Sequence, residues 1–397
     1  MNRLLLSAFA IVIALLLTAC GGSETSSNES TVRGVSDTEI IIGSQNDLSG
    51  ATAVLGVDLI NSSRMRFDEV NAAGGIHGRK IRYIVEDAGY QLPKSIQMTN
   101  KLVNRDGIFA MFLSMGTPMN NAIMQGLFKD GVPNLFPVSG GRTMVEPFHK
   151  MQFTGRGIYY DEVRAGVRYF VEERGAEKVC VMYQDSDFGI EAYEAARDQV
   201  AAMGLELAAI SAHKPTDTEF TAAVLRMRNA ECDAIMMGTI YKDTILIMEA
   251  ARKIGWSDVA FVGQNASYSR AIAEIESGAS EGYYVFAHIA VLYADSEMDE
   301  VQRTWYNNFT EQFGKEPGYV AIEGYRNADL LVKALEKAGQ DLNVDSLLAA
   351  LESITEYKDI FGNTMTFGPE DHKGVDESYL LTVKDGRWVK LDASIRY

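Results

Sequence analysis

Short apolar segments alternate with longer amphipathic segments along the chain from residue 38 onward. Short runs rich in Val, Ile and Phe are typical of buried strands, whereas apolar residues spaced three and four apart indicate helices. The predicted strands are residues 39–43, 80–86, 108–113, 132–138, 178–183, 205–211, 234–238 and 259–262. The predicted helices are residues 62–72, 93–104, 188–203, 218–229, 243–254, 299–313 and 321–338. One more helix is predicted to open at Thr117-Pro118, with Thr117 as its N-cap. Residues 379–383 and 387–391 are predicted to form a hairpin around Asp385-Gly386.

The alternation of strand and helix occurs as two successive arrays, the second beginning near residue 178. Two such arrays predict an α/β protein with two doubly wound, Rossmann-like lobes, each built on a largely parallel sheet. In these sheets a ligand lies beyond the carboxyl ends of the strands. If those edges face one another, the candidate loops are residues 47–51, 114–117, 138–142, 184–189 with 238–241, and 263–266.

The N-terminus has the pattern of an export signal. Arg3 precedes an apolar run that ends in Leu17-Thr18-Ala19-Cys20. The run is short for a membrane span but suits a signal-peptide core. Its end resembles the lipobox of bacterial lipoproteins, which implies cleavage before Cys20 and anchoring to a lipid membrane by acylation of Cys20; an ordinary signal peptide with a chance Cys is the alternative. Residues 1–19 are therefore predicted to be a signal peptide and residues 20–37 a flexible tether.

Charge and cysteine content restrict the partners. The 397 residues carry a formal net charge of −17, which disfavours nucleic acid, although such a charge most often reflects solubility alone. We expect a monomer with no nucleic-acid partner. Cys180 and Cys232 each lie in or beside a predicted strand, and both a disulfide and two buried free thiols remain open.

Patterns of catalytic or metal-binding residues are weak. The five histidines are scattered without the spacing of metal ligands. Asp185-x-Asp187 is better explained as a helix-entry cap than as a metal site. No nucleophile elbow or phosphate-binding loop is present, and Ser139-Gly140-Gly141 has no recognisable base. We therefore expect no catalytic residue, metal or cofactor.

Several segments in order resemble one protein family. They are IIGSQNDLSG at 41–50, NAAGGIHGR at 71–79, VCVMYQDSDFG at 179–189, DTEF at 217–220 and FVGQNA at 261–266. The set is similar to the leucine/isoleucine/valine-binding proteins, which are type I periplasmic binding proteins of ABC importers. The resemblance runs from about residue 38 to the end of the chain.

The resemblance implies three crossovers between the lobes, near residues 153–158, 285–290 and 363–368, forming a three-strand hinge. Each lobe would then be discontinuous. The first comprises residues 38–155 and 288–363, and the second comprises residues 156–287 and 364–397.

The resemblance also implies where a ligand is held. Thr117 matches a hydroxyl that binds the ligand carboxylate, with backbone amides at Val138, Ser139 and Gly140. Phe188 matches an aromatic against the ligand, and Tyr241 corresponds to another within one residue. The complete set of candidate ligand-binding residues is Ser49, Met115, Gly116, Thr117, Val138, Ser139, Gly140, Phe188, Tyr241, Gln264 and Asn265.

One departure from the family pattern concerns the ligand itself. Amino-acid-binding relatives hold the α-ammonium with a Glu in the loop that here reads Gly263-Gln264-Asn265-Ala266. A buried ammonium without a counter-charge is costly. We therefore expect a hydrophobic or aromatic carboxylate, to which Arg142 could add a salt bridge, or else a solute like a branched-chain amino acid.

The expected role is that of a substrate-binding lipoprotein in the periplasm or at the cell surface. It delivers solute to an ABC permease, and amino-acid transport is among the expected processes. The alternative is a sensory protein that presents solute to a receptor or kinase, because both roles use the same cleft. An enzyme is disfavoured relative to both of these binding-protein roles.

Overall fold

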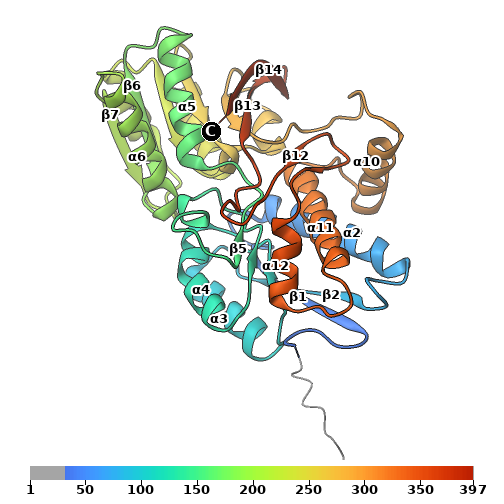
Figure 1. Cartoon of the computed structure of the whole chain (residues 1–397). Helices are drawn as coiled ribbons and strands as arrows, with labels where there is room; N and C mark the ends of the chain where they lie inside the picture. The colour runs from blue at the N-terminus through green and yellow to red at the C-terminus, as the bar shows by residue number, and fades with distance from the viewer. Residues whose placement is uncertain (1–31, 397) are drawn as a thin grey trace, which may run out of the picture. The chain divides into compact units, whose positions relative to one another are not determined.

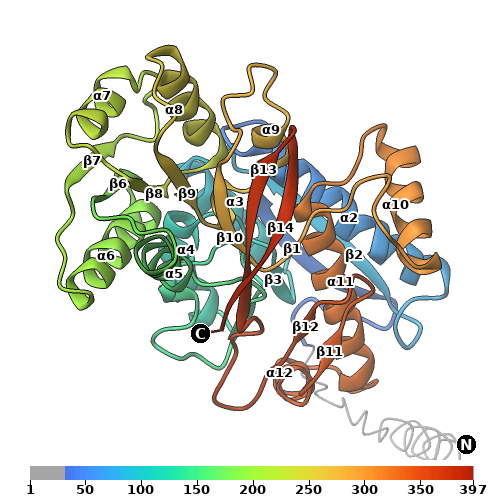
Figure 2. The ribbon, with the colours of Figure 1, turned by 90° about the horizontal axis from the view of Figure 1, so that it is seen from above.

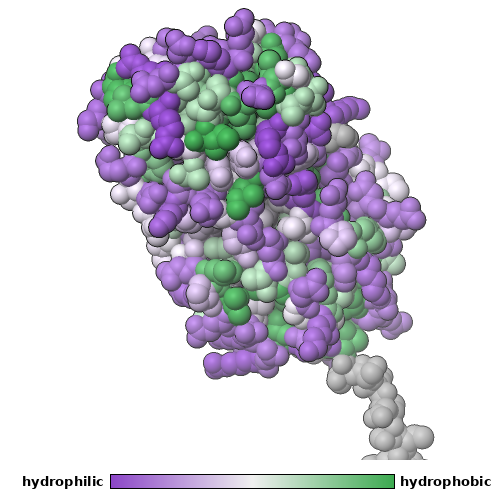
Figure 3. Space-filling view, turned by 90° about the vertical axis from the view of Figure 1, so that its left-hand side faces the viewer, coloured by the Kyte–Doolittle hydropathy of each residue, from purple (hydrophilic) through white to green (hydrophobic). Residues whose placement is uncertain are grey.

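The computed structural model describes residues 32–396, and the predicted signal peptide, Cys20 and most of the predicted tether lie outside them. The described chain contains two main sheets, ordered β2-β1-β3-β4-β5 and β14-β13-β10-β9-β8-β6-β7. Figure 1 shows the two sheets in separate halves, which we call the first and second lobes. Figure 3 shows a largely hydrophilic surface with scattered apolar residues on one face of both halves. The prediction of an α/β fold with two such lobes is confirmed.

The first lobe is built on five parallel strands. They are β1 (Glu39–Asn46), β2 (Lys80–Asp87), β3 (Ala110–Phe112), β4 (Asn134–Leu135) and β5 (Gln152–Phe153). Its helices are α2 (Ala53–Ala72), α3 (Leu92–Asn104), α4 (Thr117–Lys129), the short η1 (Arg142–Met144), α10 (Glu300–Phe313), α11 (Tyr319–Ala338) and α12 (Val344–Glu352). A small two-stranded sheet of β11 (Tyr357–Lys358) and β12 (Thr364–Met365) follows α12.

The second lobe has a seven-stranded sheet whose first five strands in chain order are parallel. These are β6 (Val179–Gln184), β7 (Ala209–His213), β8 (Ala234–Gly238), β9 (Ala260–Gly263) and β10 (Tyr284–Ala287). The antiparallel hairpin β13 (Glu377–Lys384) and β14 (Arg387–Arg396) completes the sheet. Its helices are α5 (Tyr159–Glu172), α6 (Asp187–Ala202), α7 (Thr221–Asn229), α8 (Tyr241–Lys253), η2 (Asn265–Ser267) and α9 (Arg270–Ala273). Figure 2 shows the hairpin beside β10.

The hairpin forms where the sequence predicts it. Asp385 and Gly386 have φ angles of 53° and 72°, and Lys384 pairs with Arg387. Positive φ at both central positions is the requirement of a type I′ turn, which Asp-Gly meets at low cost. The turn thereby fixes the register of the last two strands.

Several element boundaries differ from the prediction; the strand predicted at 205–211, for example, lies at Ala209–His213. Helix α2 begins at Ala53 rather than at residue 62, because Gly56, which packs closely against the Asp47 carbonyl, and the buried Asp58 interrupt the apolar spacing of its first half. The strand predicted at 132–138 is regular only at Asn134–Leu135. The helix predicted from residue 218 begins at Thr221, since Asp217 instead accepts a hydrogen bond (2.8 Å) from the Lys214 amide in the preceding turn.

The connections between the lobes lie side by side. Thr154, which follows β5, accepts from the Gly374 amide (2.9 Å) and donates its own amide to the His372 carbonyl (3.0 Å). The second connection follows β10 at His288. The third was predicted at residues 363–368, but the chain runs beside Thr154 only at residues 372–374, because β12 still pairs with β11 at Thr364–Met365.

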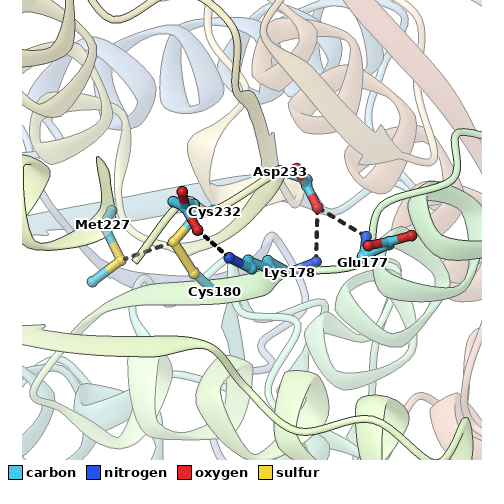
Figure 4. The surroundings of a disulfide bond; sticks show 7 residues. Glu177, Lys178, Cys180, Met227, Cys232 and Asp233 are labelled. Carbon is cyan, nitrogen blue, oxygen red and sulfur yellow. Dashed lines mark hydrogen bonds and ion pairs between the residues drawn. A yellow bond between two sulfur atoms is a disulfide. The ribbon is translucent and has the colours of Figure 1, made fainter. Parts of the chain in front are cut away.

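The two cysteines of the second lobe form a disulfide. Cys180 on β6 is joined to Cys232, just before β8, across a sequence separation of 52 residues. Figure 4 shows the bridge next to Asp233, whose carboxylate accepts the amides of Glu177 (2.9 Å) and Lys178 (2.8 Å). The structure thus selects the disulfide over the pair of free thiols.

Candidate ligand-binding site

A small cavity lies between the facing edges of the two sheets. Its volume is about 30 Å³, which leaves room for little more than water. Both lobes contribute to its lining, which consists of Thr52, Leu55, Tyr90, Met115, Gly116, Thr117, Val138, Arg156, Tyr159, Phe188, Ile240 and Ala266. The lobes are therefore packed closely together around the position where a doubly wound fold binds its ligand.

The start of α4 supplies one side of the cavity. The Thr117 hydroxyl lies 2.7 Å from the Ser139 hydroxyl, which in turn accepts from the Gly141 amide (3.1 Å). The N-cap is Gly116 rather than Thr117, because the chain turns there with a φ of 95°, which favours glycine. Thr117 is thus the first helical residue, and its hydroxyl faces the neighbouring loop instead of capping the helix.

The loop before α2 is organised by a buried carboxylate. Asp47 accepts hydrogen bonds from the amides of Ser49 (3.2 Å), Gly50 (2.5 Å) and Thr52 (2.7 Å), and from the Thr52 hydroxyl (2.8 Å). These bonds hold Thr52 at the cavity. The Ser49 hydroxyl points away, because it donates to Asp87 at 2.6 Å near the surface.

The second lobe contributes aromatic and aliphatic side chains. Phe188, buried at the start of α6, packs edge-on against Tyr159 with ring centres 5.2 Å apart. Ile240 lines the cavity, whereas the adjacent Tyr241 does not. The sequence-based assignment of Tyr241 was loose by one residue, and the structure brings its neighbour to the cavity.

The loop after β9 faces the hinge more than the cavity. Gln264 caps η2 by accepting the Ala266 amide at 2.6 Å. The Asn265 side-chain amide donates to the Glu162 carboxylate (2.8 Å) and to the Gly157 carbonyl (3.0 Å). Of this loop, Ala266 reaches the cavity.

The remaining candidates divide between cavity and surroundings. Met115, Gly116, Thr117, Val138 and Phe188 line the cavity. Ser139 and Gly140 lie directly behind it, since Ser139 bonds Thr117 and Gly140 contacts Tyr159.

Arg156 lines the cavity and forms a buried ion pair with Glu323, which the sequence did not suggest. The Arg156 guanidinium donates from Nε to one oxygen of Glu323 at 2.7 Å and from Nη2 to the other at 2.6 Å. Its Nη1 donates to Asn265 Oδ1 at 3.1 Å. Burial opposes the charge of Arg156, but Glu323 outweighs it and holds the pKa of Arg156 well above its ordinary value. The cavity therefore has a fixed cationic edge.

Glu162 lies behind this edge and accepts three hydrogen bonds. Its donors are the Asn265 amide (2.9 Å), the Asn265 side chain (2.8 Å) and the Ser378 hydroxyl (2.8 Å). Burial raises the pKa of Glu162 to about 7, against the opposing effect of these donors. The network ties the connection after β5 to β13 in the second lobe.

Arg142 does not face the cavity. It donates from Nη2 to Glu194 at 2.7 Å, and its backbone amide donates to Glu191 at 2.9 Å. The expected salt bridge from Arg142 to a ligand is therefore replaced by contacts with α6 across the cleft rim.

The start of α6 is capped by a different residue from the one predicted. Ser186 rather than either neighbouring Asp caps α6, and Asp187 accepts from Asn121 at 2.8 Å. Within residues 32–396 no cluster of three or more His, Cys, Asp or Glu side chains could hold a metal ion. The same part of the chain contains no helix with the length and apolar content of a membrane span.

The family model described as periplasmic binding protein matches residues 39–387. The chain belongs to the periplasmic binding protein family. Within this family it is similar to the Leu/Ile/Val-binding protein homolog 8 of Brucella abortus (strain 2308), with 24% identity over 345 residues that cover 82% of this chain and 83% of the relative. The family and its solved neighbours are solute-binding proteins rather than enzymes.

Two solved structures share the fold of this periplasmic binding protein. The fatty acid ABC transporter substrate-binding protein from Thermomonospora curvata has a TM-score of 0.82 and 24% identity, covering 92% of this chain and 95% of its own. A solute-binding protein from R. palustris in complex with benzoate has a TM-score of 0.76 and 18% identity, covering 89% and 95%. At these identities the likeness establishes the fold.

Proposed function

We propose that this protein is the substrate-binding component of an ABC importer and binds a small hydrophobic or aromatic carboxylate between its lobes. The observation that carries the proposal is the cavity at the facing sheet edges, to which both lobes contribute side chains. Because its volume of about 30 Å³ is too small for an organic acid, the lobes must part for ligand to enter. Hinge opening at the three connections supplies that motion.

The chemistry of the lining favours an acid with an apolar body. Leu55, Met115, Val138, Phe188 and Ile240 provide apolar surface. The hydroxyls of Tyr90, Thr117 and Tyr159 and the edge of Arg156 supply hydrogen-bond donors for a carboxylate.

The same lining disfavours a zwitterionic amino acid. No Asp or Glu is among the cavity-lining residues of the described chain, so an α-ammonium would lack a direct counter-charge. The fatty-acid and benzoate proteins with the same fold support this reading, whereas the Leu/Ile/Val-binding homolog supports a ligand like a branched-chain amino acid.

A thermal-shift screen of amino acids, aromatic acids, short-chain fatty acids and the matching amides tests the ligand class. We expect the acids to give the largest rise in Tm, and the matching amides to give little, because an amide lacks the charge that Arg156 favours. A largest shift from leucine or valine would contradict the proposed ligand class.

The Thr117 hydroxyl offers a sharper test of the site. Thr117→Ala should weaken binding of the best acid by about 1–3 kcal/mol if this hydroxyl bonds a buried carboxylate. Ser49→Ala is the matched control, because Ser49 bonds Asp87 outside the cavity. Calorimetry showing equal affinities for the Thr117→Ala and Ser49→Ala variants would remove Thr117 from the binding site.

The proposal includes an extracytoplasmic location with a lipid anchor at Cys20. The family is named for the periplasm, and the Leu-x-Ala-Cys sequence supports lipidation. Cys20→Ala should move the protein from the membrane fraction to the soluble fraction of its own cells. Unchanged partitioning, measured by immunoblotting of both fractions, would argue against the anchor.

A further inference from the structure

A second, larger cavity lies beside the three connections between the lobes. Its volume is about 410 Å³, and it shares no lining residue with the cleft cavity. Arg326 of α11 and His288 of the second connection line it, together with residues 374–377 of the third connection. The first connection contacts it indirectly, because Arg326 donates from Nη2 to the Gly155 carbonyl at 2.5 Å.

Arg326 is a buried cation without an ion-pair partner among the described residues. It is 1% exposed, and its Nε–H has no hydrogen-bond acceptor. Burial lowers the pKa of Arg326, and the nearby charge of Asp359 only partly offsets this effect. The Asp359 carboxylate is already occupied by the amides of Phe361 (2.9 Å) and Asn363 (2.7 Å). A guanidinium in this state is costly unless an anion reaches it.

His288 adds a second unpartnered donor to the same cavity. Its Nδ1 faces the Gly157 amide at 3.5 Å and therefore acts as acceptor, which assigns the proton of the neutral ring to Nε2. Burial, followed by the charges of Arg326 and Arg156, lowers the pKa of His288 well below its ordinary value and keeps the ring neutral. Among residues 32–396, Nε2 finds no hydrogen-bond partner, although His288 is only 3% exposed.

The acidic residues of this cavity have cations of their own. Asp376 lies 3.7 Å from Lys373, and Glu377 lies 4.0 Å from Arg396. A bound metal ion or amine could use those carboxylates but would leave both N–H donors unsatisfied. An oxyanion satisfies Arg326 and His288 together, since a guanidinium presents N–H groups in the geometry that carboxylates and phosphates accept.

We propose that this cavity is a binding site for a small oxyanion, a carboxylate or inorganic phosphate, held by the side chains of Arg326 and His288, which line it and carry the two unpartnered donors. The site goes beyond the proposed transport function, because it is separate from the cleft. The walls of the cavity include parts of the second and third connections, and Arg326 binds the first connection. A bound oxyanion would therefore affect how the connections hold the two lobes relative to one another.

Calorimetric titration of the purified protein with acetate, phosphate and sulfate, with chloride as the control ion, tests the site. At least one oxyanion should bind saturably and raise Tm. Arg326→Gln should weaken that binding by about tenfold or more, because the charge and the Nε donor are both lost. Arg105→Gln is the matched control, since Arg105 is exposed and does not line the cavity. Whether acetate or phosphate binds more tightly distinguishes the two sources of the oxyanion.

His288→Phe provides a second variant in case Arg326→Gln does not fold. It should also weaken the binding of the oxyanion. Thr117→Ala should leave the binding of phosphate and sulfate unchanged, which separates this site from the carboxylate site of the cleft. Absence of saturable binding up to tens of millimolar, or equal binding by wild type and Arg326→Gln, would overturn the proposal. Neither result would bear on ligand binding in the cleft.

Discussion

Two residues far apart in sequence determine the charge at the cleft. Arg156 and Glu323 are 3% and 1% exposed, and they form a bidentate ion pair. Desolvation of two such charges is expensive, so the pair is stable only while both partners are present. Its presence at the cavity therefore reflects charge placement more than a gain in folding stability.

Removing one partner should be far more damaging than removing both. Arg156→Met leaves Glu323 buried without a cation and should lower the free energy of unfolding by about 3–5 kcal/mol. The double variant Arg156→Met/Glu323→Met should recover much of that loss. Urea denaturation of the wild type, Arg156→Met, Glu323→Met and the double variant measures both effects.

The exposed pair of Lys178 and Glu231 supplies the control, because Lys178→Met removes a solvated contact and should change stability little. An Arg156→Met variant as stable as this control, or a double variant less stable than the single one, would contradict the argument.

The residue scale also shows what sequence reasoning could reach. Thr117 and Phe188 were identifiable because each matches a position of the resembled family, in a loop where a strand ends and a helix begins. Arg156 was not, since its partner Glu323 is separated from it by 167 residues and neither lies in a recognisable motif. Asn265 was assigned to the ligand, but its amide is committed to Glu162 and Gly157, contacts that only the folded hinge creates.

At the scale of elements, α2 and α11 form a close helix pair in the first lobe. A Cβ built on Gly324 of α11 would lie 2.3 Å from the Leu59 carbonyl oxygen of α2. Glycine is needed there because the two backbones approach each other without room for a side chain. The pattern of the sequence predicted α11 almost completely but missed the first half of α2, where Gly56 and the buried Asp58 interrupt the apolar spacing.

Gly324→Ala should therefore destabilise the protein despite the higher helix propensity of alanine. We expect a loss of about 1–3 kcal/mol, because the added methyl group pushes against backbone rather than against a flexible side chain. Gly126→Ala on α4 is the matched control, since nothing lies within 4 Å of its Cβ position. The free energy of unfolding of Gly126→Ala should rise by about 0.5–1 kcal/mol. Thermal unfolding of both variants checks the opposite signs, and a stabilised Gly324→Ala protein would exclude tight packing of α2 against α11.

At the scale of the whole molecule, polar contacts across the cleft rim join the lobes. Asn121 of α4 donates to Asp187 of α6 at 2.8 Å, and Arg142 of η1 donates to Glu194 of α6 at 2.7 Å. Glu191, also on α6, accepts the Arg142 amide through both carboxylate oxygens at 2.9 and 3.0 Å. The two lobes and their sheets could be predicted from periodicity, but these contacts could not, because they depend on how closely the lobes approach.

Closure should therefore depend on pH through Glu191. Burial raises the pKa of Glu191 to about 7 from its ordinary value of 4.5, and the neighbouring Arg142 amide and charge only partly oppose this. If the carboxyl regains its ordinary pKa when the lobes part, the closed form binds more protons between these two values. Closure then weakens as pH rises through this window and changes no further above it.

Ligand affinity should accordingly be severalfold higher at about pH 5.5 than at about pH 7.5, since ligand is held by the closed form. In Glu191→Gln this part of the pH dependence should disappear, because an amide does not titrate. Glu194→Gln removes the other acid that faces Arg142 while leaving Glu191 in place, so its profile should keep the wild-type slope. Calorimetry across the range, with the best acid from the screen, compares the three proteins. Parallel profiles for wild type and Glu191→Gln would show that closure does not bury this carboxyl, and the pH dependence would then have to arise elsewhere in the chain.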